Sequence, residues 1–301
     1  MTTPLEPAPP GLATRSEVWL KREDTHELGA FKWRAALPVV ERRREEGARS
    51  IVTASTGNHG AATAWAARQA GIDAVVFAPE GASRTKLAYL RRLGADVRLV
   101  GADLDEAKEA GQELARSKGV PFFEDGAEPL QYEAYGAIGE EIVDQLGGPP
   151  AAVVVPVGNG ALLGGIGRAL GRRAPSTLRV GVAAKEAPVM AQSWHAHRVV
   201  ESDRMATMAD GLAVRVAIPY AVDALDEAAD RMLLVSEQEM ARAVAAFDRA
   251  GIRVEAAAGA ALAALPELDD VDGPIVLIVT GRNIDDDLLA LCRDEPESFP
   301  D

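Results

Sequence analysis

The chain has 301 residues, which is enough for one large domain or two domains of ordinary size. Hydrophobic residues make up 48% of it and charged residues 26%, so a disordered or low-complexity chain is excluded. Asp and Glu number 46 against 32 Lys and Arg, which gives a formal net charge of -14. Because such a charge repels nucleic-acid phosphate and the sequence has no basic patch to offset it, we expect no nucleic-acid partner.

Cys292 is the lone cysteine, which excludes an intramolecular disulfide and a metal site built from several cysteines. The first residues, Met1 to Gly11, contain prolines instead of the basic region and apolar core of a secretory signal. No apolar run approaches the ~20 residues that cross a bilayer. We therefore expect a cytoplasmic protein with no membrane partner.

Short β-rich runs alternate with longer helical patterns along the chain, which is typical of an α/β protein with mainly parallel sheets. The predicted strands are 18–21, 51–54, 74–78, 96–100, 152–157, 178–182 and 275–279. Segments rich in Ala, Leu, Glu and Arg with apolar residues near a 3.6-residue period predict helices, at 31–46, 59–70, 83–93, 103–118 and 131–146. Three successive strand and helix units between residues 51 and 118 predict a small parallel sheet. Further alternation after Gly147 to Pro150 predicts a second αβ domain, with a ligand in the cleft between the two.

A lysine stands at the start of the first predicted helix, in the segment Leu28 to Arg34. Lys32 follows Gly-Ala-Phe and precedes Trp33, so its neighbours are apolar. Taken alone, it is either a surface lysine with a buried stem or a nucleophile. The second role needs desolvation or cationic neighbours, because an ordinary lysine with a pKa of ~10.4 is protonated at neutral pH.

Small and polar residues follow three predicted strands, at the strand ends where open α/β sheets bind ligands. Ser55 to Gly60 reads S-T-G-N-H-G and opens a helix, where it serves either as a cap for the first amides or as a site for a carboxylate or phosphate. Pro156 to Gly165 is a glycine loop before a helix, which favours a phosphate site. Thr280 to Asn283 reads T-G-R-N, and its hydroxyl is either a ligand contact or a cap.

In this order and at this spacing, the four segments resemble those of the fold-type II pyridoxal-phosphate enzymes, the superfamily of the tryptophan synthase β chain. Threonine and serine dehydratases, serine racemase, threonine synthase and cysteine synthase belong to it. Further motifs fit the same family: Thr3-Pro4-Leu5, the segment Leu20 to Asp24, the dehydratase-like Ala209 to Val214, and Val254-Glu255. The resemblance implies two αβ domains with twisted, mainly parallel sheets and an active site in the cleft between them. It places the large domain at 1–49 and 129–301 and the small domain at 50–128.

The resemblance also implies roles for individual residues, with pyridoxal 5′-phosphate as the cofactor. Lys32 would form the Schiff base and act as the base in proton transfer, and Asn58 would hydrogen-bond the ring hydroxyl. Thr280 would face the pyridine nitrogen. The cofactor phosphate would be held by Gly158, Asn159, Gly160, Ala161 and Leu162, and the substrate carboxylate by Ser55, Thr56, Gly57 and His59.

The implied reaction is β-elimination from an amino acid with a β-hydroxyl group, such as threonine or serine, giving a 2-oxo acid and ammonia. A neutral hydroxyl at Thr280 does not hold a proton on the pyridine nitrogen as a carboxylate would, which favours prompt loss of a leaving group over transamination. β-Replacement, a threonine-synthase-like reaction and racemisation remain alternatives within the enzyme class. A silent protein that only binds the cofactor or an amino acid is the non-enzyme alternative.

Several positions depart from the family pattern. Asn159 replaces a glycine of the usual G-G-G-G-L loop, and Arg282 replaces a glycine beside the pyridine site. Thr56 stands where serine racemase has the serine that acts as second base, which disfavours racemisation. Ala183 stands where some relatives have a glutamate that binds a cation, so we expect no metal. The resemblance implies a homodimer. Because few residues follow Asn283, we expect no regulatory domain of the kind that long threonine dehydratases append.

Overall fold

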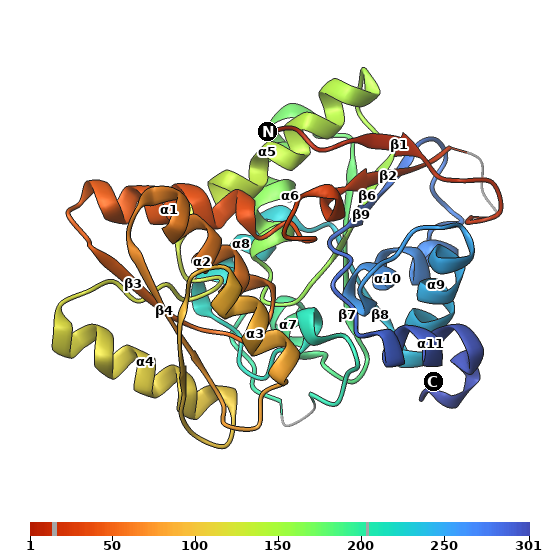
Figure 1. Ribbon diagram of the computed structural model, residues 1–301. Coiled ribbons are helices and arrows are strands. Elements are labelled where there is room, and N and C mark those ends of the chain that lie inside the picture. The colour runs from red at the N-terminus through yellow and green to blue at the C-terminus, as the bar shows by residue number, and fades with distance from the viewer. Residues whose placement is uncertain (14–16, 203–204) are drawn as a thin grey trace. The chain divides into compact units, whose positions relative to one another are not determined.

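The computed structural model describes residues 1–13, 17–202 and 205–301, and the chain separates into two compact units. Unit 1 comprises Met1–Phe31 and Tyr135–Asp301, and unit 2 is the continuous stretch Lys32–Ala134 (Figure 1). The expected small domain, 50–128, is shorter than unit 2. The difference at the first boundary arises because helix α1 (Trp33–Glu45) packs against helix α2 (Asn58–Ala70) and so belongs with the second unit.

A six-stranded sheet forms the centre of unit 1. Its order is β1 (Leu5–Pro7), β2 (Val18–Arg22), β9 (Ile275–Val279), β6 (Ala152–Pro156), β7 (Leu178–Ala184) and β8 (Arg231–Val235). β1 is antiparallel to β2, and every other pair is parallel. The helices are most of α5 (Pro129–Leu146), α6 (Ala161–Arg173), α7 (Val189–Ala196), α8 (Pro219–Ala228), α9 (Glu237–Arg249), α10 (Ala256–Ala263) and α11 (Asp286–Asp294), with short 3-10 turns at Glu23–Thr25, Asp210–Leu212, Leu265–Leu268 and Pro296–Ser298.

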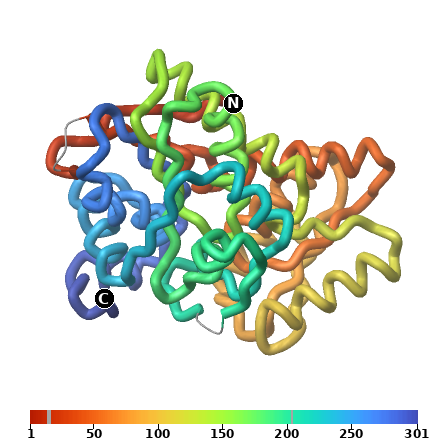
Figure 2. The backbone as a smooth tube through the Cα atoms, turned by 180° about the vertical axis from the view of Figure 1, so that it is seen from behind, coloured from red at the N-terminus to blue at the C-terminus, as the bar shows by residue number. Residues whose placement is uncertain are grey.

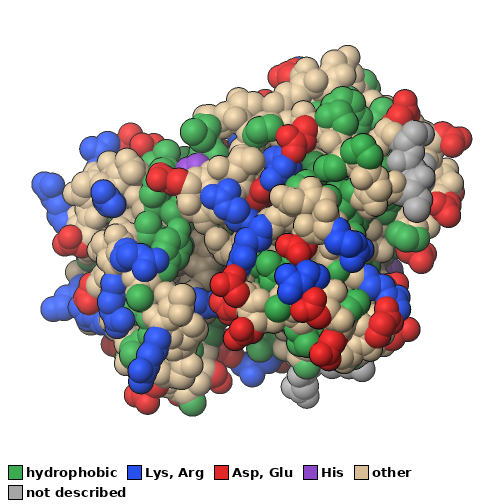
Figure 3. Space-filling model, turned by 45° about the vertical axis from the view of Figure 1, so that its right-hand side comes forward, with side chains coloured by type: hydrophobic (Ala, Val, Ile, Leu, Met, Phe, Trp, Pro, Cys, Tyr) green, Lys and Arg blue, Asp and Glu red, His purple; other side chains and the backbone are tan. Residues whose placement is uncertain are grey.

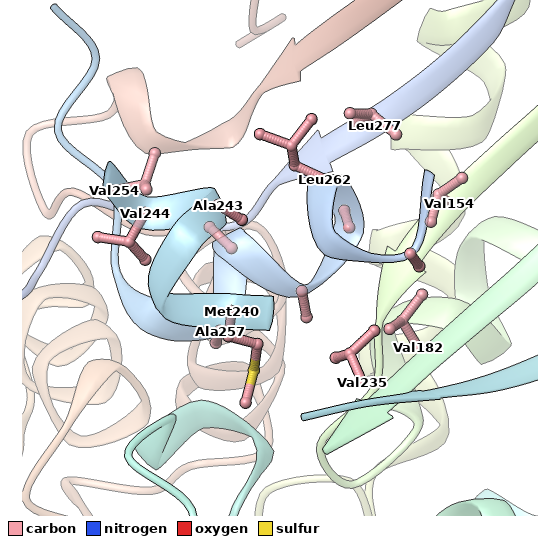
Figure 4. Close-up of a cluster of buried hydrophobic side chains, with 14 of the residues drawn as sticks. Val154, Val182, Val235, Met240, Ala243, Val244, Val254, Ala257, Leu262 and Leu277 are labelled. Carbon is pink, nitrogen blue, oxygen red and sulfur yellow. The ribbon is translucent and has the colours of Figure 1, made fainter. Parts of the chain in front are cut away.

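The core of unit 1 lies between this sheet and helices α9 and α10. β6 and β9 read A-V-V-V-P and I-V-L-I-V and are buried at every position, as expected for inner parallel strands covered on both faces. α10 reads A-A-A-G-A-A-L-A and is apolar on all sides, which is typical of a fully buried helix. Figure 4 shows Leu277 and Val154 of the strands beside Leu262 of α10, with Val244 and Met240 of α9 packed against that helix.

The N-terminal segment is fastened to α5 by a buried polar network. The Lys21 side chain has no exposed surface, and its Nζ donates to Thr3 O (2.7 Å), Glu141 Oε2 (2.6 Å) and Gln145 Oε1 (2.9 Å). Thr3 Oγ1 in turn donates to Glu23 Oε1 at 2.5 Å. Figure 2 shows the red N-terminal end of the tube beside the yellow-green α5. The Thr3 and Leu20 to Asp24 motifs of the sequence therefore serve to anchor β2.

Unit 2 contains a three-stranded parallel sheet in the order β3 (Ser50–Ala54), β4 (Asp73–Ala78), β5 (Asp96–Leu99). α2 and α3 (Arg84–Arg92) lie on one side of it and α4 (Leu104–Lys118) on the other (Figure 1). A parallel bridge joins Val52 to Phe122, so the segment before Asp125 runs beside β3.

The predicted fold class is confirmed, and each of the seven predicted strands coincides with an observed one to within two residues at either end. The prediction missed β1 and β8. β1 has three residues and contains Pro7, which gives no alternating pattern. β8 reads R-M-L-L-V, and leucine and methionine are also common in helices.

No helix in the described part of the chain is long and apolar enough to cross a membrane. On the face of the molecule in Figure 3, Lys and Arg side chains are interspersed with Asp and Glu. That face therefore presents no continuous basic patch.

Candidate functional site

Three of the four predicted motifs lie at one edge of the unit 1 sheet. β2, β9 and β6 are neighbours and run parallel, so their carboxyl ends meet at the same edge. The segment Leu28 to Phe31 follows β2 after a short turn, Thr280 follows β9 directly, and the glycine loop follows β6. Open α/β sheets bind ligands at this edge.

Backbone hydrogen bonds join the segment before Lys32 to the Thr280 segment. Phe31 N donates to Thr280 O (3.0 Å) and Arg282 N donates to Gly29 O (2.8 Å), with an antiparallel bridge between Ala30 and Gly281. Gly29 has a φ of +68°, a conformation that favours glycine, and a Cβ atom there would clash with the side chain of Asn283. The Gly-Ala-Phe and T-G-R-N motifs are thus one structural element.

Arg282, which the sequence left unexplained, links the paired Gly-Ala-Phe and T-G-R-N segments to the turn that follows β2. Its guanidinium donates to the carbonyl oxygens of Asp24 and His26, the latter at 3.2 Å. A glycine at this position would provide neither bond. The departure from the family pattern therefore has a structural reason in this chain.

Thr280 is buried and paired with a carboxylate. Its Oγ1 donates to Glu255 Oε1 at 2.9 Å, and both side chains are largely buried. A Cβ atom at Gly281 would clash with the same carboxylate, so Gly281 leaves room for Glu255. The hydroxyl proton of Thr280 thus points to Glu255, and its oxygen retains lone pairs for a second contact. That Thr280 faces the pyridine nitrogen stays a prediction.

The glycine loop has the geometry of an anion site. Gly158 lies so close to the carbonyl oxygen of Gly211, in the dehydratase-like motif, that a Cβ atom there would clash with it. Gly160 has a φ of +89° and precedes the first turn of α6. The first N–H groups of a helix have no partner within the helix, so those of Ala161 and Leu162 point toward the loop.

Asn159 changes this site in a specific way. Its Oδ1 accepts from Ala161 N at 3.1 Å, so one of the amides predicted to hold phosphate already has a partner. A phosphate oxygen at Ala161 N would displace the Asn159 carbonyl oxygen, after which Asn159 can turn its amide N–H₂ toward the anion.

In unit 2 the S-T-G-N-H turn follows β3 and opens α2. No side chain caps this helix at Gly57, and Ser55 Oγ instead accepts from Gly57 N at 3.2 Å. Gly57 is exposed, with nothing within 4 Å of where a Cβ would stand, whereas a Cβ at Gly60 would clash with Ser55 O. Thr56 lies in the turn and Asn58 is the first helical residue. The capping alternative is therefore not realised at Gly57.

The His59 ring points away from this turn and into unit 2. Its Nε2 lies 3.0 Å from Thr53 Oγ1 and 3.2 Å from Phe123 O, and its Nδ1 lies 3.6 Å from Asp125 Oδ1. Burial lowers the pKa of His59, although the Asp125 carboxylate opposes the shift, so the ring is neutral at pH 7. That His59 binds the substrate carboxylate stays a prediction, and its ring is already in contact with Thr53, Phe123 and Asp125.

Lys32 forms a short ion pair that the sequence analysis missed. Its Nζ lies 2.6 Å from Asp125 Oδ2, and the two side chains are 15% and 25% exposed. Burial alone would raise the pKa of Asp125, but the charge of Lys32 and the hydrogen bonds from Lys32 and Gln131 outweigh it and hold that pKa well below its ordinary value. Asp125 follows a segment that runs parallel to β3, so the rule that identified Ser55, a polar residue after a strand end, also applies to it.

No metal site is visible in the ranges that the structure describes: they contain no group of three or more His, Cys, Asp or Glu side chains that could hold an ion. Ala183, the position of a cation-binding glutamate in some relatives, is a buried residue of β7. The absence of a resident metal stays a prediction.

Comparison with known proteins identifies the family. A model described as "Pyridoxal-phosphate dependent enzyme" matches residues 1–281. The L-threonine ammonia-lyase of Geobacter sulfurreducens is 33% identical over 273 residues, which are 89% of this chain and 67% of that protein. The processed form of threonine deaminase isoform 2 from Solanum lycopersicum superposes with a TM-score of 0.92 at 31% identity, over 99% of this chain and 88% of that one. An L-serine ammonia-lyase from the fungus Rhizomucor miehei superposes with a TM-score of 0.87 at 25% identity, over 98% of each chain.

The chain therefore belongs to the pyridoxal-phosphate-dependent enzymes, and the expected family and cofactor are confirmed. The residues present fit this cofactor. The crowded Gly158 and the left-handed Gly160 stand on either side of Asn159 in a loop at a helix N-terminus, which suits a phosphate. A largely buried lysine begins α1, directly after the segment joined to Thr280.

A charge placed in the glycine loop tests where the phosphate binds. Asn159→Asp keeps an oxygen for Ala161 N–H but adds a negative charge. We expect the Kd of pyridoxal phosphate to rise at least about tenfold, since two like charges ~4 Å apart repel by about 1 to 4 kcal/mol in solvent-accessible surroundings. Spectrophotometric titration measures the Kd, with neutral Asn159→Gly as the control. Pyridoxal, which has no phosphate, should bind both variants alike, and an equal loss for both compounds would place the phosphate elsewhere.

Proposed function

We propose that this protein is a pyridoxal-phosphate-dependent ammonia-lyase that converts a β-hydroxy amino acid, such as threonine or serine, to a 2-oxo acid and ammonia. One observation carries the proposal: the segment before Lys32 is hydrogen-bonded to the segment that contains Thr280. Thr280, at the position predicted to face the pyridine nitrogen, is a threonine and not a carboxylate. The similarity to proteins named L-threonine and L-serine ammonia-lyase supports the same reaction.

In unit 1, the glycine loop and the first turn of α6 would hold the cofactor phosphate through Gly158, Asn159, Gly160, Ala161 and Leu162. Thr280 would contact the pyridine nitrogen by turning its hydroxyl proton from Glu255 toward that nitrogen, which is unprotonated and accepts the hydrogen bond. In unit 2, the N–H groups and hydroxyls of Ser55, Thr56, Gly57 and His59 would bind the substrate carboxylate at the N-terminus of α2, where the helix dipole favours an anion. Asn58 would hydrogen-bond the ring hydroxyl.

Lys32 would perform the proton transfer. Its neutral amine removes the proton from Cα of the substrate: the Cα–H bond breaks, an N–H bond forms on Nζ, and the electron pair stays at Cα. When bound, pyridoxal phosphate supplies the electron sink that makes this carbanion accessible. Loss of the β-hydroxyl as water, followed by hydrolysis, gives pyruvate and ammonia from serine, or 2-oxobutanoate and ammonia from threonine.

A panel of L- and D-amino acids tests this function. We expect 2-oxo acid and ammonia to appear in equal amounts from one or more L-amino acids with a β-hydroxyl, and not from alanine. Lactate dehydrogenase reports pyruvate, and glutamate dehydrogenase reports ammonia. A protein that binds the cofactor but releases neither product from any substrate would contradict the proposal.

The same panel separates the alternatives. A new C–S or C–N bond that forms only when a nucleophile is added would indicate β-replacement. Release of threonine from O-phosphohomoserine would indicate a threonine-synthase-like reaction, and inversion at Cα without ammonia would indicate racemisation. Cofactor binding without turnover of any amino acid would indicate a silent binding protein.

The proposal includes a homodimer located in the cytoplasm, without a membrane or nucleic-acid partner. The single cysteine, which is buried, is compatible with a reducing compartment. The mixture of charges on the face in Figure 3 supports the absence of a nucleic-acid partner. Sedimentation equilibrium of the holoenzyme measures the oligomeric state, and a mass equal to one chain would contradict the dimer.

A further inference from the structure

The Asp125 carboxylate is in direct contact with the Lys32 amine. The two groups lie 2.6 Å apart, as in a charge-assisted hydrogen bond. Because both side chains are largely buried, water replaces this interaction poorly, and separating the pair leaves a partly buried charge without its partner. The Asp125 carboxylate therefore interacts more strongly with the Lys32 amine than it would in an exposed ion pair.

The Asp125 carboxylate is held in place independently of Lys32. Gln131, whose side chain is fully buried, donates from Nε2 to Asp125 Oδ1 (3.0 Å) and accepts from Gly126 N through Oε1 (2.8 Å). Tyr132 Oη donates to Gly126 O at 2.7 Å. The first turns of α5 thus fix both the carboxylate and the turn after it. Asp125 Oδ2 is the oxygen that this scaffold directs to Nζ.

None of the neighbouring titratable groups His59, Glu124 and Glu128 competes with Lys32 for the Asp125 carboxylate. His59 is neutral at pH 7, so it does not neutralise the carboxylate. The next acidic residue, Glu124, pairs with Lys108, and Glu128 pairs with Arg43 at 2.7 Å. Each of these two carboxylates has its own cation, and Asp125 pairs with Lys32.

We propose that Asp125 is a positioning residue for Lys32: one of its carboxylate oxygens aims Nζ through a direct hydrogen bond. The inference rests on the proposed function, in which Lys32 is the cofactor lysine. The same contact stabilises the ammonium that forms when Nζ takes the Cα proton, so Asp125 favours the product side of that transfer. It does so through Lys32, without contact to the reacting carbon.

The test follows the reaction of Lys32 with pyridoxal phosphate in the full-length protein after its cofactor has been removed with hydroxylamine. Absorbance near ~420 nm reports the uptake. Borohydride reduction and peptide mass spectrometry then report which lysine carries the cofactor. Only the neutral amine reacts, so removal of the carboxylate charge should allow reaction at lower pH. We expect the midpoint of the rate against pH to fall by about one to three pH units in Asp125→Asn and in Asp125→Ser.

Two variants control for structural effects. Glu124→Gln removes the same charge one residue away, where the partner is Lys108, and should leave the midpoint unchanged. Asp125→Glu keeps the charge and should restore at least half of the shift. Superimposable profiles for wild type and the folded neutral variants would overturn the inference. A label on a lysine other than Lys32 would instead refute the proposed function, so the two failures are distinguishable.

Discussion

Replacement of Lys32 by alanine is expected to abolish the release of 2-oxo acid, with kcat lowered at least about 10³-fold. This variant removes both the amine that bonds the cofactor and the base that takes the Cα proton, and a positioned base alone contributes about 10²- to 10⁴-fold. A coupled assay with lactate dehydrogenase measures turnover. Borohydride reduction should leave no cofactor on the peptide that contains residue 32, although the phosphate loop remains intact.

Lys118→Ala is the matched control for this experiment. Lys118 is exposed, lies at the end of α4 and belongs to the same unit as Lys32, so its loss should change neither turnover nor labelling. Circular dichroism verifies that both variants are folded. Full activity of Lys32→Ala would refute the assigned role, and the labelled peptide would then identify the true cofactor lysine among Lys21, Lys86, Lys108, Lys118 and Lys185.

Replacement of Lys21, which is at the centre of a buried polar network, is expected to lower the free energy of unfolding. In Lys21→Met, Glu141 and Gln145 lose the Lys21 ammonium as a donor, whereas Thr3 O keeps its hydrogen bond from Gln145 Nε2. Glu141 is left as a charge whose side chain is only 15% exposed. Breaking a buried ion pair by removing one partner costs about 3 to 5 kcal/mol. We expect a loss of this size in the free energy of unfolding, measured by urea titration followed by circular dichroism.

An exposed ion pair that also involves α5 provides the comparison. Arg173 pairs with Asp144, and both side chains are close to half exposed, so Arg173→Met should cost less than about 1 kcal/mol. The double variant Lys21→Met with Glu141→Leu should recover part of the loss, because no uncompensated charge then remains at residue 141. Equal effects of Lys21→Met and Arg173→Met would show that the network has no special role.

The fold could be predicted largely because its inner strands are recognisable from their sequences. β6 and β9 are continuous apolar runs that end in small polar residues, and the same strand ends identified Gly158 and Thr280 as site candidates. β8 was missed because its leucines and methionine do not distinguish a strand from a helix. β1 was missed because it exists only as an edge paired to β2.

The contacts between segments distant in sequence could not be predicted. Asp125 is separated from Lys32 by 93 positions and lies in a loop without a recognisable motif. Arg282 donates to carbonyl groups more than 250 positions away, and only the pairing of β2 with β9 brings them together. The sequence likewise marked Asn159 as unusual, but only the loop geometry shows that its side chain takes the amide of Ala161.

The continuity of unit 2 has a consequence for the order of events during synthesis. The chain leaves unit 1 after Phe31 and returns at Tyr135, and these two rings are in contact, with centroids 5.1 Å apart. Unit 2 is complete once Ala134 has been made, whereas unit 1 still awaits β6 and β9. Since domains of a growing chain generally fold in order of synthesis, Lys32 and Asp125 can pair before the ribosome has made the glycine loop or Thr280. This order would place Lys32 beside Asp125 before the strands of unit 1 that bind the cofactor have emerged.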